Sequence, residues 1–323
     1  HLYLARQLLE ALRLDVDPTL IMRTISMSYG VLTVLLTGII ARALTGSTAV
    51  ALTTALFLAL APLHIINSHF GTADSTLVFF LWLSLLFGWR TLRDGRSLDF
   101  VLFVAAVGTT LAVKFFIPLL LPLAIVVWHQ ERRFERALEA ALLLAGSFSA
   151  ANFFNYTPWD LSRLFELIRS DNLTVVGGLT PLEQLARYSW ESTVSLGLAV
   201  WPFFAVGLGL FIARGWRHRP RLVPLDLRTW YAMTRSPYIV PVSALALHFA
   251  SLIAAGYHAP RHLLPFLPVM CLAAAMGFSR VCSWVGASRG VAGAMLLAVA
   301  AYQGYNALGT EAHFVSNLQV VAR

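Results

Sequence analysis

Charged residues are scarce in this chain of 323 residues: they make up 12% of it, whereas hydrophobic residues make up 58%. A soluble domain usually carries about 25% charged residues, so the surface of this chain cannot face water throughout. The mean hydropathy is +0.71, and apolar stretches near the roughly 20-residue length that crosses a bilayer recur along the sequence. The shortage of charge therefore excludes a soluble globular domain and predicts an integral membrane protein.

Lysine, cysteine and a signal peptide are also scarce or missing. Lys114 is the only lysine among 24 basic residues. Two cysteines, Cys271 and Cys282, offer neither a disulfide framework nor the spacing of metal ligands. The chain starts at His1 without the basic, apolar and small-residue pattern of a signal peptide. We therefore expect a fragment that lacks its natural start.

Hydropathy predicts an all-α fold, a polytopic transmembrane bundle of about ten spans that forms one integral membrane domain over residues 1–323. The expected spans are 24–41, 47–66, 74–89, 98–112, 115–128, 137–153, 191–213, 238–255, 262–279 and 290–307. The fourth and fifth spans are short, so we expect a tilt or a break around Lys114, with one combined helix as the alternative.

The arginines predict the orientation of the chain. Most of them fall in alternate connections between spans, for example in the groups around Arg90, Arg132 and Arg217. Basic loops stay in the cytoplasm, so these connections are predicted to be cytoplasmic and both ends of the chain to lie outside. Such loops control topology, and we expect no nucleic-acid partner despite the net charge of +8.

The predicted outer face carries two polar segments, a juxtamembrane segment over residues 1–23 and a loop over residues 154–190 with interfacial helices. Two helix starts occur in this loop, at 157–160 and 180–183, and each has a capping Thr, then Pro, then an acid three residues after the Thr. Aromatic residues such as Tyr188 and Trp190 predict a belt at the membrane interface. These helices indicate a site at the outer surface, or they are amphipathic linkers.

Two isolated cations require an explanation, because a charge inside an apolar span costs about 2.5–3.5 kcal/mol on insertion scales. Lys114 is interpreted as a cation that faces a phosphate at the outer surface, and the alternative is a lysine that extends from a helix end to the interface. Pro260 predicts a helix start beside Arg261, where a bound anion would offset the unfavourable helix dipole. The alternative is that Arg261 reaches lipid headgroups.

Asp74 follows a connection rich in ligand-type side chains, which include His64 and His69. The alternative for Asp74 is a helix N-cap, a position that Asp favours. Together with His258 and His262, these residues have the chemistry of divalent metal ligands, whereas the alternative is a set of hydrogen-bonded histidines. A divalent metal ion is thus the one cofactor considered, and no metal ligand is assigned.

Four stretches occur in the order seen in C-type membrane glycosyltransferases: Arg23 to Gly46, Ala61 to Asp74, Gly108 to Pro122, and Arg261 to Pro265. Over residues 1–280 the chain most resembles the protein O-mannosyltransferase-like family, which includes the aminoarabinose transferases of lipid A. The resemblance implies an inverting sugar transfer from a polyprenyl-phosphate donor, in a bacterial inner membrane, with the active site on the periplasmic or extracellular side. In that family the acidic motif lies in the first outer loop, and we expect this sequence to begin inside that loop.

The resemblance and the residue chemistry together assign provisional roles. Preorganised cations stabilise a leaving phosphate, and we assign Lys114, Arg261 and His262 to the donor phosphate. Asp74 is the candidate catalytic carboxylate, which would deprotonate an acceptor hydroxyl. Three further residues are assigned to the support of the acceptor or of a metal ion: His64, His69 and His258. The expected partners are a polyprenyl-phosphate sugar lipid and membrane lipids, with the acceptor unassigned.

Two other functions fit a membrane protein of this kind. A transporter or flippase of a lipid-linked sugar would place polar groups near the midplane, on broken helices in related halves. A non-catalytic structural subunit would show helix faces with small residues at every fourth position, and Ser47, Ala51 and Ala55 have that spacing. The polar residues of this chain concentrate instead at the predicted outer ends of spans.

Overall fold

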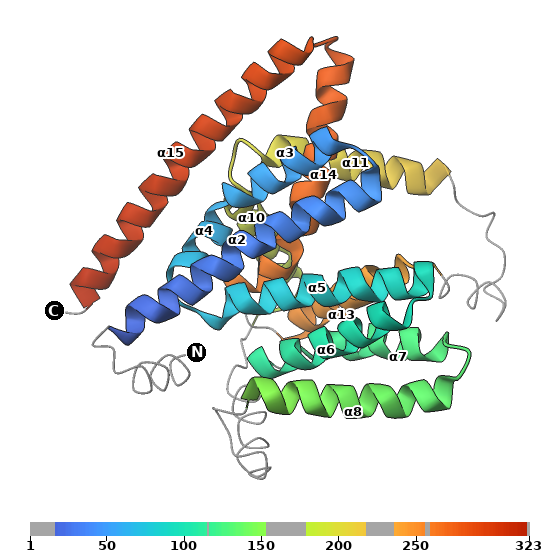
Figure 1. The fold of residues 1–323 in the computed structure, drawn as a ribbon. Helices are drawn as coiled ribbons and strands as arrows, with labels where there is room; N and C mark the ends of the chain where they lie inside the picture. The colour runs from blue at the N-terminus through green and yellow to red at the C-terminus, as the bar shows by residue number, and fades with distance from the viewer. Residues whose placement is uncertain (1–16, 115, 153–178, 218–235, 256–258, 322–323) are drawn as a thin grey trace. The chain divides into compact units, whose positions relative to one another are not determined.

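The computed structural model describes residues 17–114, 116–152, 179–217, 236–255 and 259–321 (Figure 1). The regular structure in these ranges is helical, which confirms the all-α prediction. The helices are α2 (Pro18–Thr45), α3 (Thr48–Ala59), α4 (Pro62–His69), α5 (Ala73–Asp94), α6 (Ser97–Val113), η1 (Ile117–Leu119), α7 (Leu120–Trp128), α8 (Arg133–Asn152), α10 (Pro181–Leu196), α11 (Trp201–Arg217), α13 (Ile239–Ala255), η2 (Pro260–Phe266), α14 (Leu267–Trp284) and α15 (Arg289–Val321).

Two of the predicted spans are each two helices and not one. The segment 47–66 consists of α3 and α4, which are bent by 57° at their break. Pro62 begins α4, and because proline has no N–H it cannot continue the hydrogen bonding of α3. The segment 191–213 is divided between α10 and α11 at Gly197, whose φ of +86° is readily adopted only by glycine.

Three helical stretches in the described ranges are long and apolar enough to cross a membrane: Thr19–Thr45, Ala73–Asp94 and Pro260–Trp284. The bent pair of α3 and α4 would be a fourth if it is counted as one span. Four shorter apolar helices, of 10–17 residues, lie at 97–113, 117–128, 201–213 and 239–254. The predicted count of about ten spans is therefore approximate.

The chain forms two compact units. Unit 1 comprises His1–Ile25, Thr76–Ala186 and Leu222–Ala259, and unit 2 comprises Ser26–Ser75, Arg187–Arg221 and Pro260–Arg323. In unit 1, α6 packs on α8 and α7 packs on α13, whereas in unit 2, α14 packs on both α3 and α11. That the whole chain is one integral membrane domain stays a prediction.

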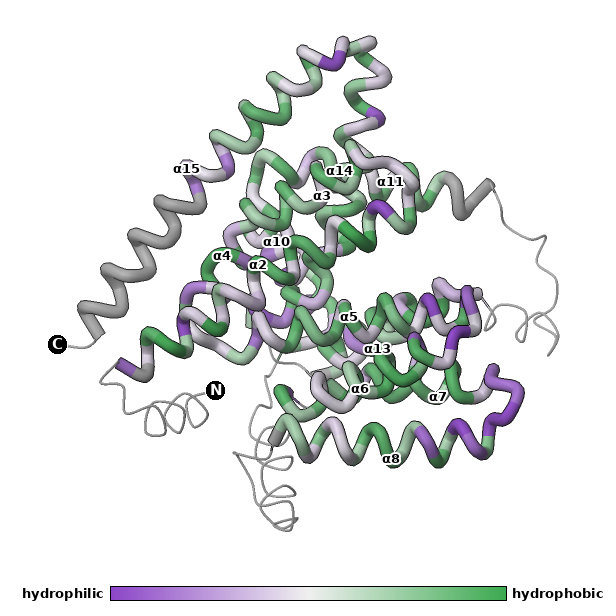
Figure 2. The backbone as a smooth tube through the Cα atoms, in the orientation of Figure 1, coloured by the Kyte–Doolittle hydropathy of each residue, from purple (hydrophilic) through white to green (hydrophobic). Residues whose placement is uncertain are grey.

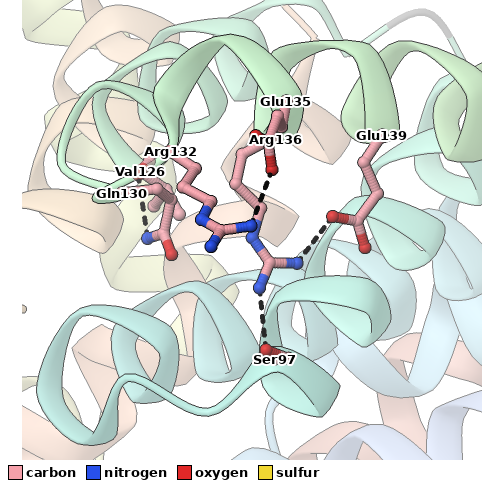
Figure 3. A network of polar contacts seen from close by, with 7 residues as sticks. All are labelled: Ser97, Val126, Gln130, Arg132, Glu135, Arg136 and Glu139. Carbon is pink, nitrogen blue, oxygen red and sulfur yellow. Dashed lines mark hydrogen bonds and ion pairs between the residues drawn. The ribbon is translucent and has the colours of Figure 1, made fainter.

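Several of the described charged side chains of unit 1 lie at helix ends and pair with one another. Figure 2 shows hydrophilic residues where α5 passes into α6 and where α7 passes into α8. Here Arg136 donates to Ser97 at 2.7 Å and to Glu139 at 2.6 Å (Figure 3). The Nε atom of Arg90 lies 3.1 Å from the carboxylate of Asp99, whose side chain is only 4% exposed. Between these charged ends the unit is apolar, with a core of Phe100, Phe103, Val104 and Val107.

Unit 2 is held by close approaches of helix backbones. A Cβ atom at Gly207 of α11 would collide with the carbonyl oxygen of Ala273 in α14, and one at Gly277 of α14 would collide with that of Phe203 in α11. In the same way, a Cβ at Gly38 of α2 would touch Ala55 of α3 at 3.4 Å. The small-residue face of α3 thus packs inside the unit and is not a free surface for a partner subunit.

The polar residue Gln303 ties α15 to the break between α10 and α11. Its side chain is fully buried, and its Nε2 atom donates to the carbonyl oxygen of Leu196 at 2.7 Å. Gly197 follows directly, and a Cβ there would collide with the Gln303 amide. A glycine is therefore needed at this break for conformation and for space.

Candidate functional site

Neutral polar side chains gather in unit 2 between α2, α4 and the start of α5, and we call Ser26, Gly30, His64, Asn67, Ser68 and Thr72 the α2–α4 polar cluster. The Ser26 hydroxyl donates to the carbonyl oxygen of Asn67 at 3.1 Å, which links α2 to α4. The Asn67 amide in turn donates to the carbonyl oxygen of Leu63 at 2.8 Å. The bond from Ser26 satisfies a backbone carbonyl near the end of α4, where a helix leaves its last acceptors without helical donors.

His64 lies on the side of α4 that faces α2. Its side chain is buried, and it is hydrogen-bonded to the backbone of Gly30. A Cβ atom at Gly30 would lie 3.7 Å from the ring Nε2 of His64 and would collide with Ser68. Glycine at position 30 therefore lets α2 approach α4 closely enough to hold the imidazole.

Asp74 is the second residue of α5 and is 8% exposed. The helix begins one residue earlier, at Ala73, so Asp74 is not the N-cap that one interpretation of the sequence expected. It follows the α2–α4 polar cluster in the chain and belongs to the same unit. His69, the last residue of α4, is half-buried. Unit 2 thus holds a buried carboxyl group and, with His262, three of the predicted histidines.

The second part of the candidate site is η2, which begins at Pro260 as the sequence predicts. The Arg261 side chain is exposed, and among the residues with assigned positions no carboxylate forms an ion pair with it. The neighbouring His262 is half-buried, and its Nδ1 atom lies 3.2 Å from the hydroxyl of Tyr188 in α10. In unit 2, η2 packs against α4, the helix that carries His64.

Arg261 and Arg280 mark the two ends of one candidate span, Pro260–Trp284. They are 19 positions apart in the sequence, which at the rises of a 3₁₀ and an α-helix corresponds to roughly 30 Å, close to the thickness of the hydrocarbon core. Arg280 stacks over Trp284 at 5.4 Å, as Arg93 does over Trp89 at 4.1 Å in unit 1. Arginine and tryptophan are typical of membrane interfaces, so these two guanidinium groups lie near opposite surfaces if this helix spans the membrane.

Lys114 belongs to unit 1, at the break between α6 and η1. It is the C-cap residue of α6 in an extended conformation, with φ −160° and ψ 134°, and its backbone N–H donates to Thr110. Its side chain is exposed. The break expected around Lys114 is thus confirmed, whereas a common site of Lys114 with Asp74 and Arg261 stays a prediction.

Other predictions concern the outer segments. The helix start at 180–183 is confirmed as a capping box, since Thr180 N–H donates to the Glu183 carboxylate at 2.8 Å and Glu183 N–H to the Thr180 hydroxyl at 3.3 Å. His258, the helix start at 157–160 and most of the segment 1–23 lie outside the described residues. No group of three or more His, Cys, Asp or Glu side chains suited to a metal occurs among residues whose positions are assigned.

Sequence reasoning missed the role of Tyr188. It predicted this residue in an interfacial aromatic belt, yet the side chain is only 2% exposed and contacts His262. One available signal was periodicity: Tyr188 is eight residues after the capping Thr180, on the side of α10 opposite the exposed Leu182 and Trp190. The contact itself joins residues 74 positions apart, and no local pattern predicts it.

The apolar helices, the bent pair and the polar groups at helix ends define an all-helical integral membrane protein. A family model described as dolichyl-phosphate-mannose-protein mannosyltransferase matches residues 6–171, about half of the chain. The chain belongs to this family, and the family consists of C-type membrane glycosyltransferases. The resemblance found in the sequence is thus confirmed, and the match includes His64, His69, Asp74 and Lys114.

A solved structure has a similar fold. It is the crystal structure of ArnT from Cupriavidus metallidurans in the apo state, with a TM-score of 0.52 and 16% sequence identity. The similarity covers 82% of this chain and 47% of that protein, so this chain spans about half of its length. No curated protein matches the chain.

Proposed function

We propose that this chain is the membrane-embedded part of an inverting glycosyltransferase that moves a sugar from a polyprenyl-phosphate donor to an acceptor on the non-cytoplasmic side of a bacterial inner membrane. The observation that carries the proposal is the family match over residues 6–171, the stretch that contains Asp74 and Lys114. The fold similarity to ArnT supports the same class of membrane architecture.

The donor phosphate is assigned to Arg261, His262 and Lys114. Sugar transfer leaves a polyprenyl phosphate, and its developing negative charge is stabilised by cations and hydrogen-bond donors already in place. An exposed guanidinium without a carboxylate partner among the placed residues can bind phosphate through two parallel hydrogen bonds. The exposed ammonium group of Lys114 has the chemistry for a second contact.

Asp74 is assigned to the acceptor. A carboxylate within hydrogen-bond reach of an acceptor hydroxyl takes up its proton as the hydroxyl attacks the anomeric carbon. Asp74 is buried at the start of α5, close in sequence to the α2–α4 polar cluster, whose hydroxyl, amide and imidazole groups suit a hydroxylated acceptor. We assign His64 and His69, together with His258, to the support of the acceptor or of a metal ion.

A sugar-transfer assay on the full-length protein in lipid nanodiscs tests the proposal. The donor is a polyprenyl-phosphate sugar with a labelled sugar, and the readout is release of polyprenyl phosphate together with label in the acceptor fraction. Arg261→Ala is expected to lower kcat/KM by about 10- to 10²-fold, as expected for the loss of a charge-assisted contact of about 1.5–3 kcal/mol. The matched control is Arg280→Ala, at the other end of the same span, which should keep wild-type transfer.

Three results would contradict the proposal: no cleavage of any polyprenyl-phosphate sugar by the wild type, equal loss in both arginine variants, or movement of the intact lipid across the bilayer without cleavage. The last result would identify a flippase. The bend of 57° between α3 and α4 is the feature of this chain that such a transporter would share.

A further inference from the structure

A hydrogen bond between distant parts of the chain fixes the imidazole ring next to the exposed arginine. Tyr188 of α10 and His262 of η2 are 74 residues apart, and their Oη and Nδ1 atoms are separated by 3.2 Å. The tyrosine side chain is 2% exposed, whereas His262 is half-buried and Arg261 is exposed. The pair therefore connects the interior of unit 2 to the surface on which Arg261 lies.

The local structure determines where the phenol lies. The capping box of Thr180 and Glu183 fixes the first turn of α10, and Tyr188 follows about two turns later on its buried side. On the other side, Pro260 begins η2 and Leu263 and Leu264 are buried, which fixes the backbone next to His262. Both groups of the pair thus lie on helical segments.

The chemistry of the pair selects one tautomer of the imidazole. A neutral imidazole has one N–H donor and one acceptor nitrogen, and the partner of one nitrogen decides which of the two carries the proton. Phenol is the stronger acid of the two groups and imidazole the stronger base, so the bond is stronger when Tyr188 donates to Nδ1. The proton of His262 then resides on Nε2, where it can be donated to an anion.

We propose that Tyr188 is a positioning residue that holds His262 with its proton on Nε2, so that His262 donates a hydrogen bond to the donor phosphate beside the guanidinium of Arg261. This inference rests on the proposed function, because the phosphate is that of the lipid-linked sugar. The role of Tyr188 is indirect: it contacts the histidine and not the lipid. Arg261 supplies charge at this site, and His262 supplies a directed donor.

Binding of undecaprenyl monophosphate to the full chain in nanodiscs tests the inference without any sugar transfer. We expect Tyr188→Phe and His262→Ala each to raise Kd about tenfold, which corresponds to about 1.4 kcal/mol. The double variant should bind no more weakly than His262→Ala alone, because tyrosine acts only through the histidine. His262→Gln places an amide N–H near the position of Nε2, so it should restore most of the affinity and make Tyr188→Phe neutral. Tyr305→Phe, which alters an exposed tyrosine of the same unit, should leave Kd unchanged.

The inference would be overturned if Tyr188→Phe bound the lipid as the wild type does, if its effect and that of His262→Ala added in the double variant, or if the wild type did not bind the monophosphate. If Tyr188→Phe failed to fold, the comparison of His262→Ala with His262→Gln would decide. Equal affinities of these two variants for the monophosphate would overturn the inference. In the transfer assay the loss should appear in kcat/KM for the donor. Tyrosine-dependent phosphate binding by a wild type that transfers no sugar would support the pair and contradict the transferase proposal.

Discussion

The two units use polar side chains in opposite ways. In unit 1, several charged residues at helix ends pair internally, as Arg90 does with Asp99 and Arg136 with Glu139. Unit 2 buries neutral groups in the α2–α4 polar cluster and exposes Arg261, which has no carboxylate partner among the placed residues. A paired charge already has its counter-charge, whereas an exposed cation at a helix start can pair with a negative charge on a ligand. The difference indicates that the paired charges of unit 1 stabilise the fold, and it agrees with the binding role proposed for Arg261 in unit 2.

The largest effect is expected for Asp74→Asn, which tests the chemical role proposed for the buried carboxyl group of unit 2. The amide keeps the size of the side chain but cannot accept a proton, so transfer should fall by about 10²–10⁴-fold, as for the loss of a general base. The melting temperature should stay within a few degrees of the wild type. Asp94→Asn, at the opposite end of α5, is the control and should transfer sugar normally. Normal turnover by Asp74→Asn would show that Asp74 is not the base.

Arg90→Leu tests whether the paired charges of unit 1 stabilise the fold. The substitution leaves the buried carboxylate of Asp99 without its partner, and breaking a buried pair in this way typically costs about 3–5 kcal/mol. Arg93→Leu removes an exposed, solvent-screened pair with Asp94 and should cost much less. Thermal unfolding in detergent measures both. A similar loss in the two variants would mean that burial of Asp99 does not distinguish the pairs.

A smaller effect is expected at the seam between α11 and α14 in unit 2. Gly277→Ala forces a methyl group against the carbonyl oxygen of Phe203, so the helices must move apart at a cost of about 1–3 kcal/mol. Gly209→Ala lies on α11 with no heavy atom within 4 Å of the added Cβ, and it should gain up to about 1 kcal/mol of helix propensity. Unfolding temperatures that move in opposite directions are the expected result, and equal temperatures would contradict the close packing.

The smallest effect is expected for Asp17, whose carboxylate accepts a hydrogen bond at the start of α2. Its carboxylate accepts the Thr19 N–H at 2.8 Å, and hydrogen bonds from Thr19 lower the pKa of Asp17 below its usual value of 3.8. Because the folded pKa is the lower one, the stabilisation is complete above pH 4 and is lost as pH falls through the folded pKa. The protection factors of the amides in the first turn of α2, which are corrected for the intrinsic pH dependence of exchange, should therefore fall below pH 4. In Asp17→Asn, which keeps a capping oxygen, this fall should disappear.

The features that could be predicted from sequence are those determined by residues that are close together in the chain. Hydropathy gave the helical class, Pro260 gave the start of η2, and the Thr180 and Glu183 pair gave the start of α10. The bend at Pro62 was missed because the apolar composition continues across it, so hydropathy alone does not reveal the missing N–H. Tyr188 was misplaced because its burial depends on a contact with η2, which only the tertiary structure creates.

The backbone contacts between α11 and α14 have a consequence for lipids around the protein. Where Gly207 and Gly277 bring two peptide backbones together, the gap is narrower than a methyl group, so no acyl chain can enter between the helices. The two helices should therefore move as one rigid body in any rearrangement of unit 2. An acceptor or a polyprenyl chain that approaches this unit has to reach it along some other edge.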